Sequence, residues 1–482
     1  MTSPTTFPLP RPLLLSLLTF LCLSNVNASS DSSLPASPAL PAQWQNAPAT
    51  SIISVAAKNA SSPEATLTTW WSRLGDPILD ELIRNSLQSS PDIRSALSRI
   101  EQARASRKLQ VASLLPSLSL GTSARASRST SASSASVVSG DSYAASLDAS
   151  WEIDLFGKQR KHLSAAEARQ AASVENLHNV QASLAAEVAN TYINLRASQQ
   201  KLQVAKDNLR LREQTHEITL FREKAGRASN LDALQSSTSL EQTRAAIPAL
   251  EQSISEARNQ LTLLAGKAPG TFDVLLNDQN PIPTAPSELS LAIPADTLRQ
   301  RPDVRSAELS LRAATAETSA ARRSRFPSLN LSGSFGVNSL MAERLFRPEA
   351  TALALIGSLS APLFDGGRIR QNITIASESE KQAFIAWESS ILTALSEVEN
   401  ALVAISRDDA QLAHLKLAAD SSHEAAVLAA LQYEAGMSEL LTVLDTQRTE
   451  LSARDQLLSV TAARTQAHVQ LFKALGGGWS AK

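Results

Sequence analysis

Residues 143–158 read YAASLDASWEIDLFGK and mark a change from one repeating pattern to another. As far as Asp154, apolar residues alternate with mostly polar ones, as in a strand with two different faces. The apolar face consists of Tyr143, Ala145, Leu147, Ala149, Trp151 and Ile153. The stretch therefore predicts a strand over about residues 143–154.

After Gly157 the spacing of apolar and small residues changes to steps of four and three, which is the pattern of a packed helical seam. The seam consists of Leu184, Val188, Thr191, Leu195, Ser198, Leu202, Ala205 and Leu209. No proline occurs between Lys158 and Gly226. At about 1.5 Å per residue, a helix over this segment would be roughly 100 Å long.

The composition also favours long helices over ordinary globular packing. Aromatic residues make up only 4% of the chain, glycine occurs only 16 times, and Ala and Leu carry much of the apolar content. Small side chains of this kind let helices approach closely. The net charge is -1 and no basic stripe occurs, so nucleic acid is not an expected partner.

Residues 1–28 are expected to form a signal peptide. Arg11 provides the positive start, residues 13–23 form a short apolar run, and residues 26–28 offer small side chains for cleavage. No later apolar run is long enough for a membrane helix. Cys22, the only cysteine, would be lost on cleavage, which excludes disulfides and cysteine chemistry in the mature chain.

Residues 29–63 are rich in Ser, Ala, Pro and Asn, which predicts an extended tether. Beyond the tether, the chain contains an internal repeat. Residues 91–96 (PDIRSA) return as residues 302–307 (PDVRSA), and residues 116–120 (PSLSL) return as residues 327–331 (PSLNL), both at an offset of 211. A shared offset over this distance indicates a duplication, with repeats at 64–280 and 281–482.

Each repeat is expected to contain two strands followed by two long helices. The first has strands at about 117–125 and 143–154, a Ser-rich loop between them at about 126–141, and helices at about 158–225 and 229–266. The second has strands at about 328–337 and 352–362, and helices at about 368–435 and 438–475. The fold class is thus mainly α, with four strands that have the alternation of a membrane β-barrel.

Four strands cannot close a barrel, because about eight is the usual minimum and open edges are not tolerated in lipid. Several copies must therefore share one barrel, and three copies would supply twelve strands. In such a barrel Asp148, Glu152 and Asp154, on the polar face of their strand, would line the lumen.

Enzyme chemistry has little support in the sequence. The histidines have no ligand-pair spacing; they are His162, His178, His216, His414, His423 and His468. No metal site and no cofactor are expected. Asp445 shares a helix surface with Leu441 and Arg448, and from the residues alone a solvated acid is the simplest interpretation of its role.

Four segments carry a family resemblance: residues 151–158 (WEIDLFGK), 362–368 (PLFDGGR), 444–448 (LDTQR) and 473–479 (KALGGGW). With the tandem repeat, they make the chain similar to TolC-type outer-membrane efflux proteins, and especially to their NodT-like branch. The resemblance extends from about Trp70 to Trp479. Many NodT-like relatives are lipoproteins, whereas the large Leu21 before Cys22 departs from the lipidation pattern.

The resemblance implies a homotrimer with a twelve-stranded barrel in the outer membrane and a long α-helical barrel across the periplasm. Its implied partners are outer-membrane lipid, a periplasmic adaptor protein and an inner-membrane pump. It also implies a periplasmic gate formed by Leu441, Asp445 and Arg448. The hairpin tips at Gly226 and Gly436 would contact the adaptor and pump.

The leading hypothesis is a passive exit duct for small molecules in a tripartite efflux system. A type I protein-secretion duct is the alternative with the same architecture, and the sequence does not choose between drug and protein export. A periplasmic coiled-coil scaffold or adaptor is the alternative from another class. The four strands, with the alternation of strands that face lipid, argue against a scaffold or adaptor, because an adaptor does not need them.

Overall fold

The computed structural model describes residues 44–46, 67–130, 137–277, 280–285 and 298–479. The predicted signal peptide at 1–28 and most of the predicted tether at 29–63 lie outside these residues. Within the predicted tether, Trp44 is buried against Val398 and Leu402. The large apolar indole is removed from water by packing on the helix surface.

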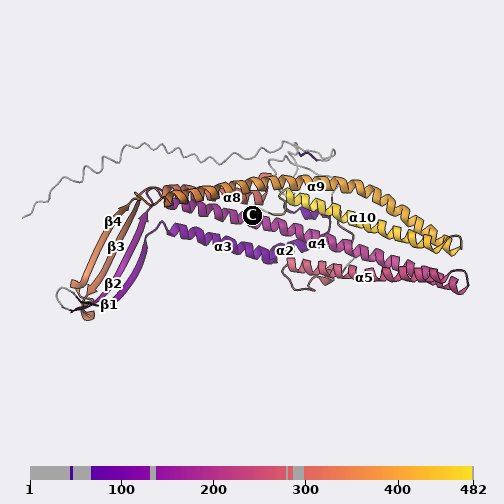
Figure 1. Cartoon of the computed structure of the whole chain (residues 1–482), viewed down its shortest axis with the longest axis horizontal. Coiled ribbons are helices and arrows are strands. Elements are labelled where there is room, and N and C mark those ends of the chain that lie inside the picture. Colours follow the sequence, from indigo (N-terminus) through magenta and orange to yellow (C-terminus); the bar gives the residue numbers. More distant parts are fainter. Residues whose placement is uncertain (1–43, 47–66, 131–136, 278–279, 286–297, 480–482) are drawn as a thin grey trace, which may run out of the picture. The chain divides into compact units, whose positions relative to one another are not determined.

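Both repeats share the order helix, strand, strand, long helix, shorter helix, and each has further short elements of its own (Figure 1). The first comprises the 3-10 helix η1 (Trp70–Leu74), α2 (Pro77–Ser89), α3 (Pro91–Ala112), β1 (Ser117–Thr130), β2 (Val137–Ile153), α4 (Lys158–Lys224), α5 (Asn230–Leu264) and α6 (Asp273–Leu276). The second comprises α8 (Pro302–Arg323), β3 (Ser328–Ser339), the 3-10 turns η2 (Ala342–Arg344) and η3 (Pro348–Ala350), β4 (Thr351–Ser360), α9 (Arg368–Glu434) and α10 (Leu440–Ala474). Helices α4 and α9 have 67 residues each, and α5 and α10 have 35 each. None of the described helices has both the length and the apolar character needed to cross a membrane.

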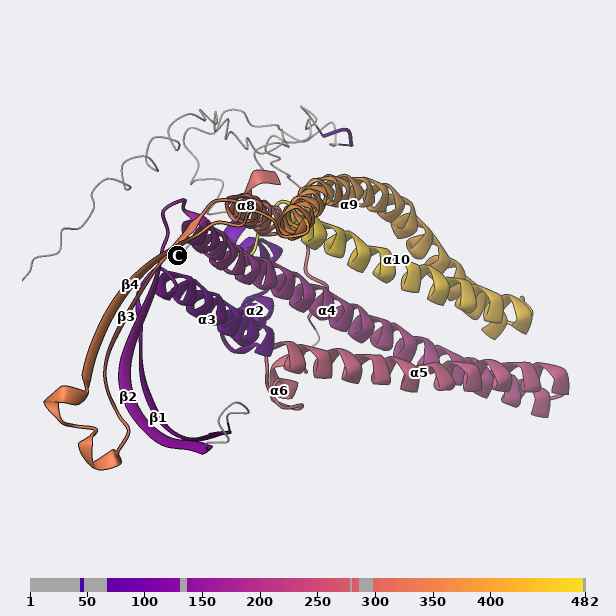
Figure 2. The ribbon, with the colours of Figure 1, turned by 60° about the vertical axis from the view of Figure 1, so that its left-hand side comes forward.

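The four strands form one antiparallel sheet in the order β1-β2-β3-β4 (Figures 1 and 2). Its register places Leu120, Leu147, Phe335 and Leu353 in one row across all four strands. Neighbours in a row lie on the same face of a sheet. The alternation seen in the sequence therefore produces one continuous apolar face.

Strands β1, β2 and β3 are longer than the predicted segments, whereas β4 has 10 residues. Strand β1 continues to Thr130 and β2 starts at Val137, although the sequence predicted a loop over about 126–141. The register pairs Ala126 with Asp141, so the backbone ladder continues into the Ser-rich segment. Serine lowers strand propensity only weakly, and pairing with a neighbouring strand outweighs it.

Gly336 lies where the backbone of β2 comes close to β3. A Cβ atom at this position would lie 2.6 Å from the carbonyl oxygen of Ala145 and 2.9 Å from the Cα of Ser146. At Gly333, on the same strand, a Cβ would meet nothing closer than the Leu355 side chain at 3.7 Å. The β2–β3 pairing therefore requires glycine at 336 but not at 333.

We therefore expect Gly336→Ala to destabilise the folded protein by about 1–3 kcal/mol, the usual cost of forcing atoms into a packed site. Gly333→Ala is the matched control and should have little effect. Thermal unfolding in detergent compares the two variants. Equal midpoints would contradict the close approach at Gly336.

The principal core surrounds the middle of α4. The predicted seam is buried at Leu184, Val188, Leu195 and Ala205, and its other members are partly buried. The indole of Trp70 packs against this core and stacks on Phe472 of α10, with ring centroids 5.5 Å apart. The α4 seam thus brings the start of the first repeat together with the end of the second.

His468 of α10 is a buried titratable group, only 1% exposed. Neither ring nitrogen has a hydrogen-bond partner in the described part of the chain. Burial, helped by the nearby charge of Arg464, lowers the pKa of His468 to about 4, although Asp409 acts in the opposite direction. The folded chain therefore favours the neutral imidazole.

Because unfolding restores an ordinary pKa near 6.5, the unfolded chain binds the extra proton first as the pH falls. The contribution of His468 to the free energy of unfolding is fully present above pH 6.5. It falls by about 3 kcal/mol as the pH drops to 4. His468→Leu should shrink the difference between melting temperatures at pH 7 and pH 4.5. Replacing the exposed His414 by Leu should leave that difference unchanged, and an unchanged difference in both variants would exclude this role of His468.

Candidate functional site

Each repeat contains a long helical hairpin that turns at a glycine. Gly226 has φ 69° between α4 and α5, and Gly436 has φ 80° between α9 and α10. These are left-handed values that favour glycine. At both tips a backbone N–H just past the helix donates to a carbonyl of its last turn, as is usual at helix ends. The N–H of Arg227 donates to the Arg222 carbonyl, and the N–H of Met437 donates to the Gln432 carbonyl, each at 2.8 Å.

The predicted gate residues lie together at the start of α10. An Arg448 Nη donates to Asp445 Oδ1 at 2.7 Å, one helical turn apart. Leu441 is 63% exposed, and the side chains of Asp445 and Arg448 are 60% and 77% exposed. An ion pair this exposed contributes about 0–1 kcal/mol. In a single chain, therefore, the three residues form a surface patch and not part of a core.

A groove separates this patch from the first hairpin. Its volume is about 360 Å³, and α4, α5 and α10 all line it. Leu441, Asp445 and Arg448 face Arg212 of α4 and Thr243 of α5 across the groove. The groove therefore leaves space between these residues and the first hairpin. A movement of the second hairpin towards the first would close this space, and a movement away would widen it.

Next to the groove, buried polar contacts hold the second hairpin against α4. The hydroxyls of Thr219 and Tyr433 lie 3.0 Å apart, and Gln447 Nε2 donates to the Thr215 hydroxyl at 3.1 Å. The guanidinium of Arg222 lies over the Tyr433 ring, 4.3 Å from its centroid. None of these five residues was predicted from the sequence. The spacing of Thr215 and Thr219, four residues apart on one side of α4, was the sequence feature that could have indicated them.

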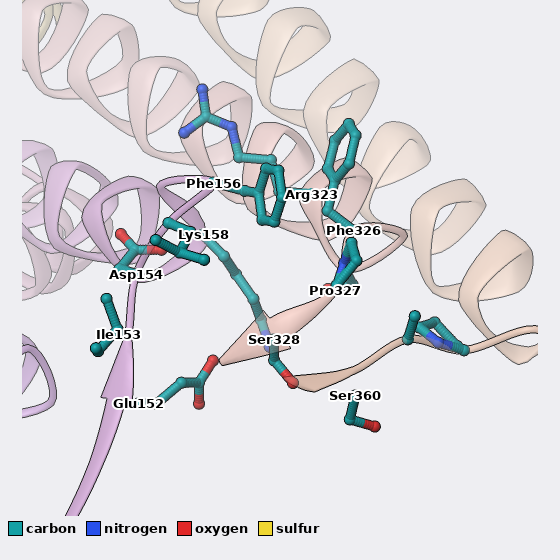
Figure 3. A pocket seen from close by; sticks show the side chains of 14 residues that line it. Glu152, Ile153, Asp154, Phe156, Lys158, Arg323, Phe326, Pro327, Ser328 and Ser360 are labelled. Atoms are coloured by element: carbon teal, nitrogen blue, oxygen red, sulfur yellow. The ribbon is translucent and has the colours of Figure 1, made fainter. Parts of the chain in front are cut away.

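At the other end of the long helices, the strands join α4 around a second pocket (Figure 3). Asp154 was predicted to be a lumen-facing strand residue, and this prediction is wrong because β2 ends at Ile153. Its carboxylate instead accepts hydrogen bonds from the backbone N–H of Arg160 at 2.9 Å and from the Arg160 side chain at 3.2 Å. A carboxylate here compensates the unpaired N–H groups at the start of α4.

Contacts between the two repeats stabilise the same junction. Arg323 at the end of α8 donates to the Gly157 carbonyl at 2.8 Å. The rings of Phe156 and Phe326 stack with centroids 5.0 Å apart. Glu152 remains on the strand and lines the pocket (Figure 3). These contacts fix the direction in which the strands leave the helices.

Asp148 lies on the same face of β2 as Glu152. The Ser146 hydroxyl donates to its carboxylate at 2.7 Å, and its strand neighbours are Ser119 and Ser334. The face is therefore polar and lined by small side chains. In the described part of the chain, no group of three or more His, Cys, Asp or Glu residues could hold a metal ion.

The chain is similar to known proteins over most of its length. The family model for "Outer membrane efflux protein" matches it twice, at residues 82–267 and 293–477. The pyoverdine export outer membrane protein OpmQ of Pseudomonas aeruginosa is 32% identical and covers 96% of this chain and 97% of its own length. Nodulation protein T of Rhizobium leguminosarum bv. trifolii is 27% identical, with coverage of 87% and 90%.

Among solved structures, the outer-membrane channel OprN superposes with a TM-score of 0.81 at 29% identity and covers 92% of this chain and 99% of its own. The likeness thus includes the sheet, the helices and both repeats. The resemblance to TolC-type proteins of the NodT-like branch is confirmed. The chain belongs to the outer membrane efflux protein family, and it is an outer-membrane efflux channel that extends into the periplasm.

Proposed function

We propose that this channel works as the passive exit duct of a tripartite efflux system, docked to a periplasmic adaptor and an inner-membrane pump. Small molecules would pass through it from the periplasm to the exterior without any reaction catalysed by the duct. The four-stranded sheet joined directly to the long helices is the observation that carries the proposal. It provides a membrane segment and a periplasmic segment in one chain.

The active assembly is a homotrimer. Strands β1 and β4 each have one unpaired edge, and backbone groups in lipid must be paired. Twelve strands from three copies close a barrel with the apolar row at Leu147 towards lipid. Asp148 and Glu152, on the opposite face, then line the lumen.

The second hairpin forms the gate. Three copies of Leu441 and Asp445 approach one axis, where an apolar ring blocks hydrated solutes and an acidic ring favours cations. Arg448, bonded to Asp445, limits the repulsion between the acids. Partners that bind the tips at Gly226 and Gly436 would shift the hairpin to its open position.

A protein-secretion duct would use the same architecture, and a periplasmic scaffold would not need the sheet. The efflux reading is favoured by relatives whose names state export of small molecules, such as the toluene efflux pump outer membrane protein TtgF of Pseudomonas putida, 31% identical over 96% of this chain.

The proposed assembly predicts that the stable species in detergent is a trimer, with a protein mass close to three times that of the mature chain, which is somewhat below the 51.4 kDa of the full sequence. Light scattering coupled to size exclusion, corrected for bound detergent, measures it. A well-folded monomer that retains its sheet would rule out the shared barrel.

A further inference from the structure

The groove between the two hairpins contains a buried arginine that the proposed function does not use. Arg212 of α4 is 7% exposed and lines this groove together with residues of α5 and α10. Its Nε donates to Asn208 Oδ1 at 2.8 Å. Among the described residues, no acceptor is bonded to its two Nη groups. Arg212 therefore presents unused donors to the groove.

The charge of Arg212 also has no counter-ion. A buried guanidinium usually pairs with a carboxylate, because removing a lone charge from water is costly. Burial lowers the pKa of Arg212, and no carboxylate in the described part of the chain counteracts this effect. Asp445 lines the same groove, but its carboxylate already accepts from Arg448 at 2.7 Å. The site thus lacks one anion.

The duplication shows that a hairpin of this type does not need the arginine for its own packing. Helices α4 and α9 have 67 residues each and begin 210 residues apart. At this offset Arg212 corresponds to Ser422, and Asn208 corresponds to Ala418. The pair of Arg212 and Asn208 is therefore specific to the first hairpin, whose helices α4 and α5 line the groove.

The other side chains around the groove complement a small organic anion. Arg212 and Arg448 are cationic and Asp445 is anionic, so the residues that line the groove carry one net positive charge. The groove also has an apolar part, formed by Ala205, Ala246, Leu441, Leu444 and Leu451. Its volume of about 360 Å³ lies in the usual range of small-molecule sites.

We propose that this groove binds a small organic anion with one acidic group and an apolar body, and that Arg212 is its anchor. The Nη groups of Arg212 donate to the oxygens of a carboxylate, whose planar geometry a guanidinium matches. The leucines of α10 cover the apolar body. An occupant also prevents the second hairpin from closing the groove. This site goes beyond the proposed function, because conduction along the duct does not require binding here.

Fluorine NMR tests the site in the full-length protein in detergent. The probe is para-(trifluoromethyl)benzoate, and para-(trifluoromethyl)benzamide is a neutral control of nearly the same shape. We expect the benzoate to bind about tenfold more tightly than the benzamide, because hydrogen bonds to a charged group are stronger. Micelles without protein provide the blank. Equal affinities would overturn the proposal, and are the expected result if Asp445 occupies Arg212 in solution.

Two variants locate the binding. Arg212→Gln removes the charge and keeps an amide donor for Asn208, so the preference for the benzoate should disappear. Ala246→Trp fills the groove from an exposed position on α5, so benzoate binding should be largely lost. Ala245→Trp is the matched control, because Ala245 is exposed on the same helix but does not line the groove. It should bind the benzoate like the unmodified protein.

Ala246→Trp decides the question if Arg212→Gln does not fold. Benzoate binding that survives Ala246→Trp unchanged would place the site elsewhere and overturn the proposal. An equal loss of binding in Ala245→Trp would also overturn it, since the groove would then not differ from the rest of the α5 surface. Either failure leaves the exit duct standing, because the mass in detergent tests that assembly separately.

Discussion

Replacing Leu441 and Asp445 together by Ala is expected to open the channel. The change removes the apolar ring and the acidic ring at the proposed constriction while leaving the helix of α10 intact, because Ala has the highest helix propensity. If the two rings stabilise the closed state by about 1.4 kcal/mol, the open fraction rises about tenfold. Conductance in planar bilayers measures the effect, and entry of vancomycin into intact cells provides a second reading.

The first repeat provides the matched control. Leu231 and Gln235 of α5 correspond to Leu441 and Asp445, so the acid is absent from that hairpin. Leu231→Ala with Gln235→Ala should leave conductance close to that of the unmodified channel. If both double variants form inserted trimers and conduct like the unmodified protein, Leu441 and Asp445 are ordinary helix residues and the gate lies elsewhere.

Leu147→Arg is expected to abolish most of the insertion into membranes. Leu147 occupies the centre of the apolar row formed with Leu120, Phe335 and Leu353. An arginine that faces lipid near the bilayer midplane costs about 2–4 kcal/mol, and three copies would carry it in each barrel. The fraction of protein that folds into lipid vesicles, followed by its resistance to protease, measures insertion.

Ser146→Arg is the control on the opposite face. Its strand neighbours are Gly121 and Gly336, so the longer side chain has space above the sheet. Insertion should remain near that of the unmodified protein, because this face is proposed to line the aqueous lumen. Equal loss of insertion for both variants would show that the two faces of the sheet are not distinguished by lipid.

The strands and long helices could be predicted because their periods are strong and local. Alternation of side chains around Leu147 and the steps of four and three around Val188 each specify one conformation. The strand ends could not be predicted as well, since pairing of Ala126 with Asp141 extends the ladder into residues that read as a loop. Local alternation gives little sign of how far such pairing continues along a hairpin.

Within the candidate site, local order along α10 brought Leu441, Asp445 and Arg448 together, as the spacing predicted. Asp154 was misplaced because alternation alone does not show that a strand stops and a helix start needs an acceptor. The contact of Thr219 with Tyr433 joins helices of different repeats. Packing between distant segments decides such contacts, and periodicity cannot reveal them.

The two hairpin turns differ in how the helix that follows each of them is capped. At the first, the Ser229 hydroxyl accepts from the N–H of Asp232 at 3.2 Å, while the Asp232 carboxylate accepts from the N–H of Ser229 at 2.9 Å. Glu439, the corresponding residue at the start of α10, provides no side-chain cap. A cap of this type contributes about 1 kcal/mol. The first turn of α10 therefore lacks a stabilising contact that the first turn of α5 has, and under a load applied equally to both tips we expect it to unravel first, next to Leu441 and Asp445.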